Sequence, residues 1–104
     1  GVNFLGASVE LTSSSVKDIL FQLKSEQSNF VGIIGNIEGS KCGMHVIISE
    51  NLVAEKDWNA SAWIKEISNI IQGGGGGQPF YATAGGKNPA GLQEALEKAK
   101  SYIV

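Results

Sequence analysis

Five consecutive glycines, Gly73–Gly77, constrain this chain more than any other feature of its sequence. Glycine has no side chain to pack and loses more conformational freedom on folding than any other residue, so five in a row are expected to end regular structure. We therefore expect a glycine-rich loop over residues 73–77, with a helix before it and a strand after it. Seven of the 14 glycines lie between Gly73 and Gly86.

The remaining composition is that of one globular domain. With 104 residues, 42% apolar and 17% charged, the chain can bury a core of its own, which excludes an intrinsically disordered segment and a coiled coil. All 8 basic residues are lysines, and 10 acidic residues give a net charge of −2. Such a balance excludes a protein that collects nucleic acid by bulk positive charge, because those proteins are usually basic.

The single cysteine, the length of the apolar runs and the first residue limit the compartment, the membrane contacts and the completeness that we expect of this chain. Cys42 has no partner for an internal disulfide, which predicts a reducing compartment, the cytoplasm. No apolar run approaches the about 18 residues that a membrane-spanning helix needs, so no membrane partner is expected. Because the chain begins at Gly1 without a methionine, inside an apolar run, we expect it to be a piece of a longer protein.

The part of the chain before the glycines predicts a strand, a helix and a hairpin. Residues 2–11 form a β-prone run, and the hydroxyls of residues 13–15 are typical of a helix N-cap. The helix that follows should bury one face, made of Val16, Ile19, Leu20 and Leu23. Two β-rich runs, 30–38 and 44–50, flank a loop of about five residues and predict a hairpin with a bulge. Two glycines in the first run, Gly32 and Gly35, indicate either bulges or close packing of a helix.

The second half predicts two helices and one more strand. Asn59 is a suitable N-cap for a helix whose buried stripe includes Trp63, and the five glycines end that helix. Residues 80–84 are expected to be a short strand, and Asn88-Pro89 begins a terminal helix over about 89–103. The order β-α-β-β-α-β-α predicts an α/β fold (α+β mixed), a single domain over 1–104 with a mixed sheet and packed helices.

The glycine run does not match the known phosphate-binding loops. A P-loop would need a glycine where Tyr81 stands and a hydroxyl where Asn88 stands, and Gln78 breaks the dinucleotide-binding pattern. Two interpretations of Gly73–Gly77 stay open. The run is either a flexible connector or an exposed stretch of backbone that a bulky partner can approach closely, because no Cβ is in the way.

A second glycine site, Gly85-Gly86-Lys87, connects the expected last strand to the terminal helix. Free backbone N–H groups, the helix dipole and the Lys87 ammonium would converge there on a phosphate or another anion. An ordinary, well-capped helix start explains the same residues without a ligand.

No set of residues predicts catalysis or metal binding. His45 and Cys42 supply two ligands where a zinc site needs four, and a lone histidine on a strand is usually structural. The acidic cluster Glu50, Glu55 and Asp57 fits a solvated connector better than a catalytic carboxylate pair. One ring, Phe80 or Tyr81, should be exposed for stacking on a base, because neighbouring strand residues face opposite sides.

The stretch GGGGGQPFYATAGG at residues 73–86, followed by a charged terminal helix, resembles the C-terminal end of alanyl-tRNA synthetases. The family's pattern there is a glycine run, arginine-proline, an Ala-x-Ala-Gly-Gly segment and a last helix. The resemblance is strongest over residues 59–100 and implies the DHH-associated domain that is shared with DHH phosphoesterases. Gln78 replaces both the synthetases' arginine and the histidine usual in the phosphoesterases, which favours the synthetase branch.

This resemblance implies a non-catalytic domain that contacts the tRNA elbow and assists aminoacylation and editing in an alanine–tRNA ligase. ATP and zinc are then expected only in other domains of the parent protein, and its partners are alanine-specific tRNA, the rest of the synthetase chain and a second copy in a homodimer. The alternatives are a protein-interaction or dimerisation module and an accessory nucleic-acid-binding domain of a DHH phosphoesterase. The implied RNA-binding residues are Gly73, Gly74, Gly75, Gly76, Gly77, Gln78, Phe80, Tyr81, Gly85, Gly86 and Lys87.

Overall fold

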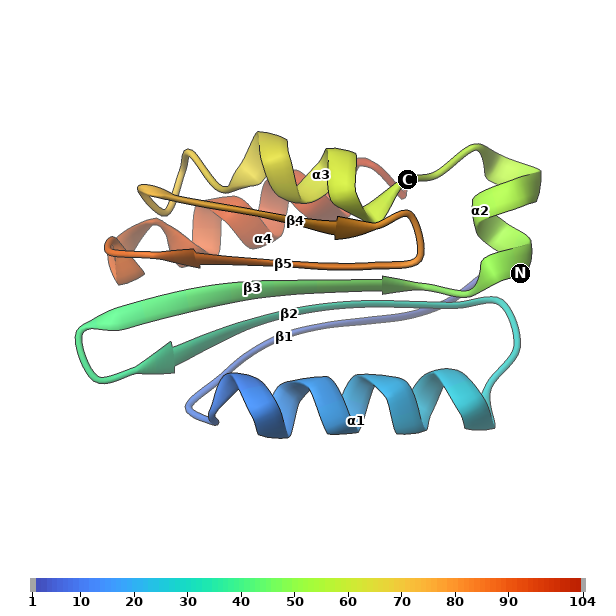
Figure 1. Ribbon diagram of the computed structural model, residues 1–104, viewed down its shortest axis with the longest axis horizontal. Coiled ribbons are helices and arrows are strands. Elements are labelled where there is room, and N and C mark those ends of the chain that lie inside the picture. The colour runs from blue at the N-terminus through green and yellow to red at the C-terminus, as the bar shows by residue number, and fades with distance from the viewer. Residues whose placement is uncertain (1, 104) are drawn as a thin grey trace.

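A five-stranded mixed sheet with strand order β1-β2-β3-β5-β4 forms the middle layer of the molecule (Figure 1). The computed structural model describes residues 2–103, and Gly1 and Val104, the ends of the expected domain, lie outside that range. β1 runs parallel to β2, and every other pairing is antiparallel. The strands are β1 (Asn3–Val9), β2 (Phe30–Glu38), β3 (Lys41–Ile48), β4 (Gly73–Gln78) and β5 (Tyr81–Gly86).

Helices cover the two faces of this sheet unequally. α1 (Ser13–Glu26) packs on one face against β2 and β3, whereas α3 (Ala60–Ile67) and α4 (Leu92–Ser101) pack on the other (Figure 1). α2 (Glu50–Lys56) lies at one end of the sheet, and a short 3₁₀ turn, η1 (Pro89–Gly91), leads into α4. The face that carries α1 therefore has its helix over the middle strands, while β4 and β5 lie beyond it.

Strand alternation divides the buried residues into two cores, one on each face. On β3, Met44, Val46 and Ile48 join the core under α3 and α4, and Ile47 joins the smaller core under α1. This confirms the predicted division of that strand. Trp63 is buried as expected, and Val16 and Leu20 anchor α1, but Ile19 is 38% exposed and does not belong to the core face.

Each of the two glycines inside β2 leaves space for a leucine side chain of a helix. A Cβ at Gly32 would lie 2.6 Å from the Leu20 side chain of α1, and a Cβ at Gly35 would lie 2.8 Å from the Leu92 side chain of α4. Of the two explanations open from the sequence, close packing of a helix is therefore the one that holds.

The main correction to the predicted order concerns the glycine run. Residues 73–77 are not a loop: together with Gln78 they form β4, an edge strand paired with β5. The structure also has a helix, α2, that the sequence pattern did not predict, so the order is β-α-β-β-α-α-β-β-α. β4 can form here because β5 supplies a partner for its backbone, which outweighs the poor strand propensity of glycine.

Smaller differences concern where elements begin and end. The β2–β3 hairpin closes with a two-residue turn in place of a five-residue loop, and Gly39 takes the positive φ of 62° that such turns need at their first position. Thr12, not a serine of residues 13–15, caps α1. Phe80 lies in the turn before β5, and the terminal helix begins with η1 and ends at Ser101.

Candidate nucleic-acid interface

Alternate glycines of β4 lie so close to β5 that no side chain fits. A Cβ at Gly73 would be 1.8 Å from the Gly85 carbonyl oxygen, one at Gly75 would be 2.0 Å from that of Thr83, and one at Gly77 would be 2.5 Å from that of Tyr81. These contacts are far shorter than van der Waals distances. Glycine at these three positions is therefore a requirement of the strand pairing.

The other glycines of the same two strands leave free space. A Cβ at Gly74 or at Gly85, which face each other across the ladder, would meet no heavy atom within 4 Å, and one at Gly76 would make only ordinary contacts at 3.9 and 4.0 Å. At Gly74 and Gly85, backbone therefore forms the surface of the sheet.

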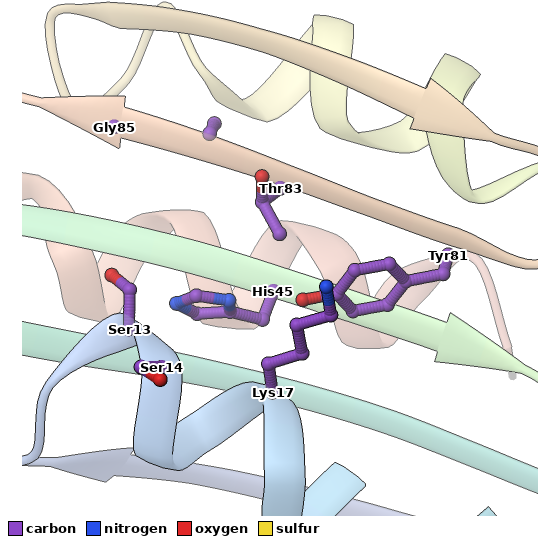
Figure 2. Close-up of a pocket in the computed structure, with 8 residues that line it drawn as sticks. Ser13, Ser14, Lys17, His45, Tyr81, Thr83 and Gly85 are labelled. Atoms are coloured by element: carbon purple, nitrogen blue, oxygen red, sulfur yellow. The ribbon is translucent and has the colours of Figure 1, made fainter. Parts of the chain in front are cut away.

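A groove, which we call the α1–β5 groove, runs beside this backbone surface. Its first compartment, of about 450 Å³, lies between α1 and β5. Figure 2 shows Ser13, Ser14 and Lys17 of α1 on one side, Thr83 and Tyr81 of β5 on the other, and the His45 ring of β3 between them. The compartment is lined by Ser13, Ser14, Lys17, His45, Tyr81, Thr83, Ala84 and Gly85.

The second compartment, of about 480 Å³, continues the groove towards the end of β5. It is lined by Ser13, Glu38, Lys41, Cys42, Gln72, Gly73, Gly85, Gly86 and Lys87. Ser13 and Gly85 line both compartments, so the two cavities adjoin at the start of α1 and the glycine of β5. Its walls carry three lysines and one glutamate, although the whole chain has a net negative charge.

Hydrogen bonds fix the start of α1 over the groove. The Ser13 N–H donates to Glu38 Oε1 at 2.7 Å, and the Ser15 N–H donates to the capping hydroxyl of Thr12 at 3.1 Å. Asn36 Nδ2 donates to the Leu11 carbonyl at 2.9 Å. The Glu38 carboxylate thus holds the helix start in place, and the three lysines are the groove's other charged groups.

His45 is buried at the base of the first compartment, with only 2% of its surface exposed. Its Nε2 donates to Asn36 Oδ1 at 2.9 Å, because Asn36 Nδ2 is engaged with the Leu11 carbonyl. Nδ1 has no hydrogen-bond partner within residues 2–103. Burial lowers the pKa of His45 to about 4, and the opposing attraction of Glu38 is smaller, so the ring is neutral at pH 7.

The two predicted stacking residues are both half-buried and both already in contact with α1. The Tyr81 ring packs edge-on against Phe21 with centroids 4.8 Å apart, and burial raises the pKa of its hydroxyl. Lys24 Nζ lies 4.8 Å from the centroid of Phe80 and forms an ion pair with Glu50. Tyr81 lines the groove, whereas Phe80 and the exposed Gln78 line neither compartment.

The expected anion site after β5 does not have the predicted geometry. Gly85 and Gly86 belong to the strand, and the N–H groups of Lys87 and Asn88 both donate to the Ile71 carbonyl at 3.0 Å. Those two donors are therefore not available to an anion. The exposed Lys87 side chain instead lines the groove, where it joins Lys41.

The groove brings together five of the predicted residues, Gly73, Tyr81, Gly85, Gly86 and Lys87, and leaves Gly74–Gly77, Gln78 and Phe80 outside its lining. Its α1 and hairpin side was not predicted: Ser13, Ser14, Lys17, Lys41 and His45 line it as well, and Thr83 of β5 is a further residue that was not predicted. The alternation of β3 placed His45 on the face opposite Met44, which was the one signal in the sequence for this side.

Residues 2–103 offer neither a metal centre nor a membrane-spanning helix. Within this range no three histidine, cysteine, aspartate or glutamate residues are placed to hold a metal ion. The helices of the same range are also too short or too polar to cross a membrane. Cys42 is a free, buried thiol whose pKa is raised by that burial.

Comparison with known proteins places these features in a family. The DHHA1 domain family matches residues 1–104. The chain is 50% identical over 103 residues to an alanine–tRNA ligase of Christiangramia forsetii and 44% identical over 103 residues to one of Flavobacterium psychrophilum. Each match covers 99% of this chain and 12% of the relative, so the chain spans about one eighth of the length of these enzymes.

A solved structure shows the same fold. The crystal structure of the C-Ala domain from Aquifex aeolicus alanyl-tRNA synthetase superposes with a TM-score of 0.82 over 97% of this chain and 93% of that chain, at 24% sequence identity. The five-stranded mixed sheet with its helices is thus the fold of that domain. With a family match over its whole length, the chain belongs to the DHHA1 domain family.

Proposed function

We propose that this chain is the RNA-binding C-terminal domain of a cytoplasmic alanine–tRNA ligase and that it contacts the elbow of alanine-specific tRNA. The observation that carries the proposal is the α1–β5 groove, in which three lysines lie beside the glycine backbone of residues 73, 85 and 86. The match to alanine–tRNA ligases at 50% and 44% identity supports the choice of RNA.

The groove has the chemistry that an RNA backbone needs. Lys17, Lys41 and Lys87 offer ammonium groups to phosphates, and the hydroxyls of Ser13 and Thr83 can donate to phosphate or ribose oxygens. The exposed Gln78 amide and the β4 backbone extend this surface beyond the groove. In this role the domain is non-catalytic: it would assist aminoacylation and editing by holding the tRNA. ATP and zinc would bind in other parts of the parent protein.

Fluorescence anisotropy with labelled tRNA tests this function. We expect the 104-residue chain to bind alanine-specific tRNA more tightly than a variant of that tRNA whose elbow pairing is disrupted. Equal affinity for the two would contradict the elbow contact, and no binding to either would contradict the RNA-binding function. A stable dimer in sedimentation, together with no tRNA binding, would instead support a protein-interaction module.

A charge-matched pair of variants tests whether the groove is the site. Replacing Lys17, Lys41 and Lys87 with alanine should weaken tRNA binding at least ten-fold, because three phosphate contacts are lost. The control replaces Lys56, Lys98 and Lys100, which are exposed on α2 and α4, and changes the net charge by the same amount. Equal losses in the two variants would show that general charge, and not the groove, binds the tRNA.

A further inference from the structure

Resting on the RNA-binding function proposed above, we infer that the first compartment of the α1–β5 groove recognises the sugar of the RNA, and that His45 Nδ1 accepts a hydrogen bond from a ribose 2′-hydroxyl. His45 is then the residue by which this domain distinguishes RNA from DNA. The 2′-hydroxyl is the group that deoxyribose lacks, and it can donate a hydrogen bond as well as accept one.

The hydrogen bonds around His45 determine which nitrogen of its ring carries the hydrogen. Asn36 Nδ2 donates to the Leu11 carbonyl at 2.9 Å and to Ser13 Oγ at 3.3 Å, so Asn36 presents its Oδ1 to the ring. His45 Nε2 lies 2.9 Å from that oxygen and must therefore carry the hydrogen. Because the ring is neutral at pH 7, Nδ1 has a free lone pair and can only accept.

No group within residues 2–103 donates to this lone pair. Thr83 lies directly opposite His45 on the β3–β5 ladder, and its hydroxyl and that of Tyr81 line the same compartment, yet neither donates to Nδ1. A buried acceptor without a partner destabilises the fold, and such groups are rare in native proteins. Since the ring lies in the wall of the first compartment (Figure 2), a ligand that fills this compartment can supply the missing donor.

The other polar groups of this compartment favour a negative charge beside that donor. Lys17 provides an ammonium group from α1, and the hydroxyls of Ser13 and Ser14 lie at the start of the same helix, where the helix dipole is positive. A ligand that satisfies both sides therefore carries a hydroxyl next to an anionic group. The compartment of about 450 Å³ is large enough for such a unit.

The RNA backbone has this combination at every nucleotide, because each 2′-hydroxyl lies on the carbon next to the one that bears the 3′-phosphate. Paired RNA displays its 2′-hydroxyls in a wide, shallow minor groove, and unpaired nucleotides display them as well. The contact is therefore compatible with the folded elbow of a tRNA. DNA would keep the phosphate contact with Lys17 but would leave His45 Nδ1 without a donor.

Fluorescence anisotropy with a sugar-modified tRNA tests this contact. We expect the wild-type chain to bind alanine-specific tRNA about ten-fold more tightly than the same tRNA with 2′-deoxynucleotides in its elbow, because a site built for a hydroxyl rejects the analogue that lacks it. His45→Gln can still donate to Asn36 but has no Nδ1, so in this variant the ratio of the two affinities should fall towards unity. Any effect of the deoxy sugars on the tRNA itself is common to both proteins and cancels in the comparison.

A second variant and one measurement on the wild-type chain serve as controls. Ser68→Ala removes another buried polar side chain, at the end of α3, which lines neither compartment, and it should keep the wild-type ratio. Nitrogen NMR of His45 in the wild-type chain needs no variant. The Nδ1 resonance should move upfield when tRNA is added and should move less with the 2′-deoxy tRNA, because only the ribose donates to it.

The failure of this contact and the failure of the proposed function give different results. The same affinity ratio in the wild-type chain and in His45→Gln, or an Nδ1 resonance that does not move in tRNA-saturated protein, would overturn the sugar contact and leave the RNA-binding function standing. If the wild-type chain did not bind tRNA at all, both would fail. If His45→Gln did not fold, as judged by thermal melting, the NMR comparison of the two tRNAs would decide.

Discussion

A single methyl group at position 75 would lie 2.0 Å from the Thr83 carbonyl oxygen and 2.5 Å from the Ala84 Cα. Both neighbours are backbone atoms of β5 and cannot turn away as a side chain could. We therefore expect Gly75→Ala to destabilise the domain by about 1–3 kcal/mol or more, since the two strands must separate to admit the methyl group. Urea unfolding followed by tryptophan fluorescence measures this loss.

The neighbouring glycine provides the control. Gly74 has the same flanking glycines, but a Cβ there meets no atom within 4 Å. Gly74→Ala should change the free energy of unfolding by less than about 1 kcal/mol, in the stabilising direction if the loss of freedom in the unfolded chain dominates. Equal destabilisation by both substitutions would mean that flexibility of the whole run, and not contact with β5, is what the fold requires.

His45 should make the stability of the domain depend on pH. Its folded-state pKa of about 4 lies below the ordinary value of about 6.5. Between about pH 4 and pH 6.5, His45 is therefore protonated in the unfolded chain and neutral in the folded chain. The stability is fully present above pH 6.5 and is lost as the pH falls towards 4. Between pH 7 and pH 5 we expect a loss of about 2 kcal/mol.

Chemical denaturation at several pH values tests the role of His45. In a His45→Gln variant, which can still donate to Asn36 but does not titrate, this part of the pH dependence should disappear. Glu38 is the acidic group that acts on His45, and it supports the charged form only weakly against burial. An unchanged pH profile in the variant would assign the dependence to other groups.

At the residue scale, the sequence predicted that the glycine run is important, but not which of its glycines the fold requires. Glycine has poor strand propensity, and five in a row look like a loop in any local analysis. The reason for Gly75 lies in Thr83 and Ala84 of the partner strand, and their approach follows from the three-dimensional pairing. The register of β4 against β5 depends on tertiary contacts, so the sequence of the glycine run itself does not reveal it.

At the scale of elements, the contact of Gly35 with Leu92 is the point where β2 and α4 approach each other most tightly at a glycine. A Cβ at Gly35 would lie 2.8 Å from Leu92 Cδ1, and Leu92 is 3% exposed. We expect Gly35→Ala to cost about 1–3 kcal/mol by overpacking and Leu92→Ala to cost about 2–5 kcal/mol by leaving a cavity.

The double variant distinguishes this contact from two independent defects. The added methyl group partly fills the space that Leu92 leaves. The double variant should therefore lose less free energy of unfolding than the sum of the losses in the two single variants, with a coupling of about 0.5–3 kcal/mol. A double-mutant cycle in urea measures it. Simple additivity would show that glycine is needed at position 35 for its backbone conformation, and not for the close approach of α4.

Elements with a strong pattern were predicted well, and short ones were not. The spacing of Val16 and Leu20 predicted α1, and Asn59 predicted the start of α3, where its side chain accepts the Ala62 N–H at 3.1 Å. α2 has seven residues and a single buried side chain, Leu52, so it has no periodic stripe to detect. Its place at the end of the sheet depends on the strands on which it packs.

At the scale of the whole molecule, a net charge of −2 coexists with a groove that carries three lysines. Binding of RNA through these three lysines should therefore have a modest salt dependence. Each phosphate on a single strand contributes about −0.7 to the slope of log affinity against log salt, so we expect a slope of about −2. Affinity would then fall about 20-fold between 50 and 200 mM salt.

Anisotropy titrations over a range of salt concentrations measure this slope, and Lys17→Ala should reduce it by about one phosphate contact. Lys98→Ala, on α4, should leave it unchanged. A slope much steeper than −2 for the wild-type chain would require further cationic contacts outside the groove.

The groove is the part of the molecule that the sequence predicted least. Lys17, Lys41 and Lys87 are separated by tens of residues and lie in α1, in the β2–β3 hairpin and directly after β5. Nothing in the local sequence of any one of them indicates a common site. The mixed sheet brings them together by placing β5 next to β3 and α1 over the hairpin.

The open position at Gly85 also has an evolutionary consequence. Glycine at 73, 75 and 77 should persist in every chain that keeps this strand pairing, whatever its ligand, because β5 leaves no room. Gly85 is under no such steric demand, because a Cβ there would meet no heavy atom within 4 Å. In a set of homologues that had lost the ligand, residue 85 should therefore diversify while residues 73, 75 and 77 stay glycine.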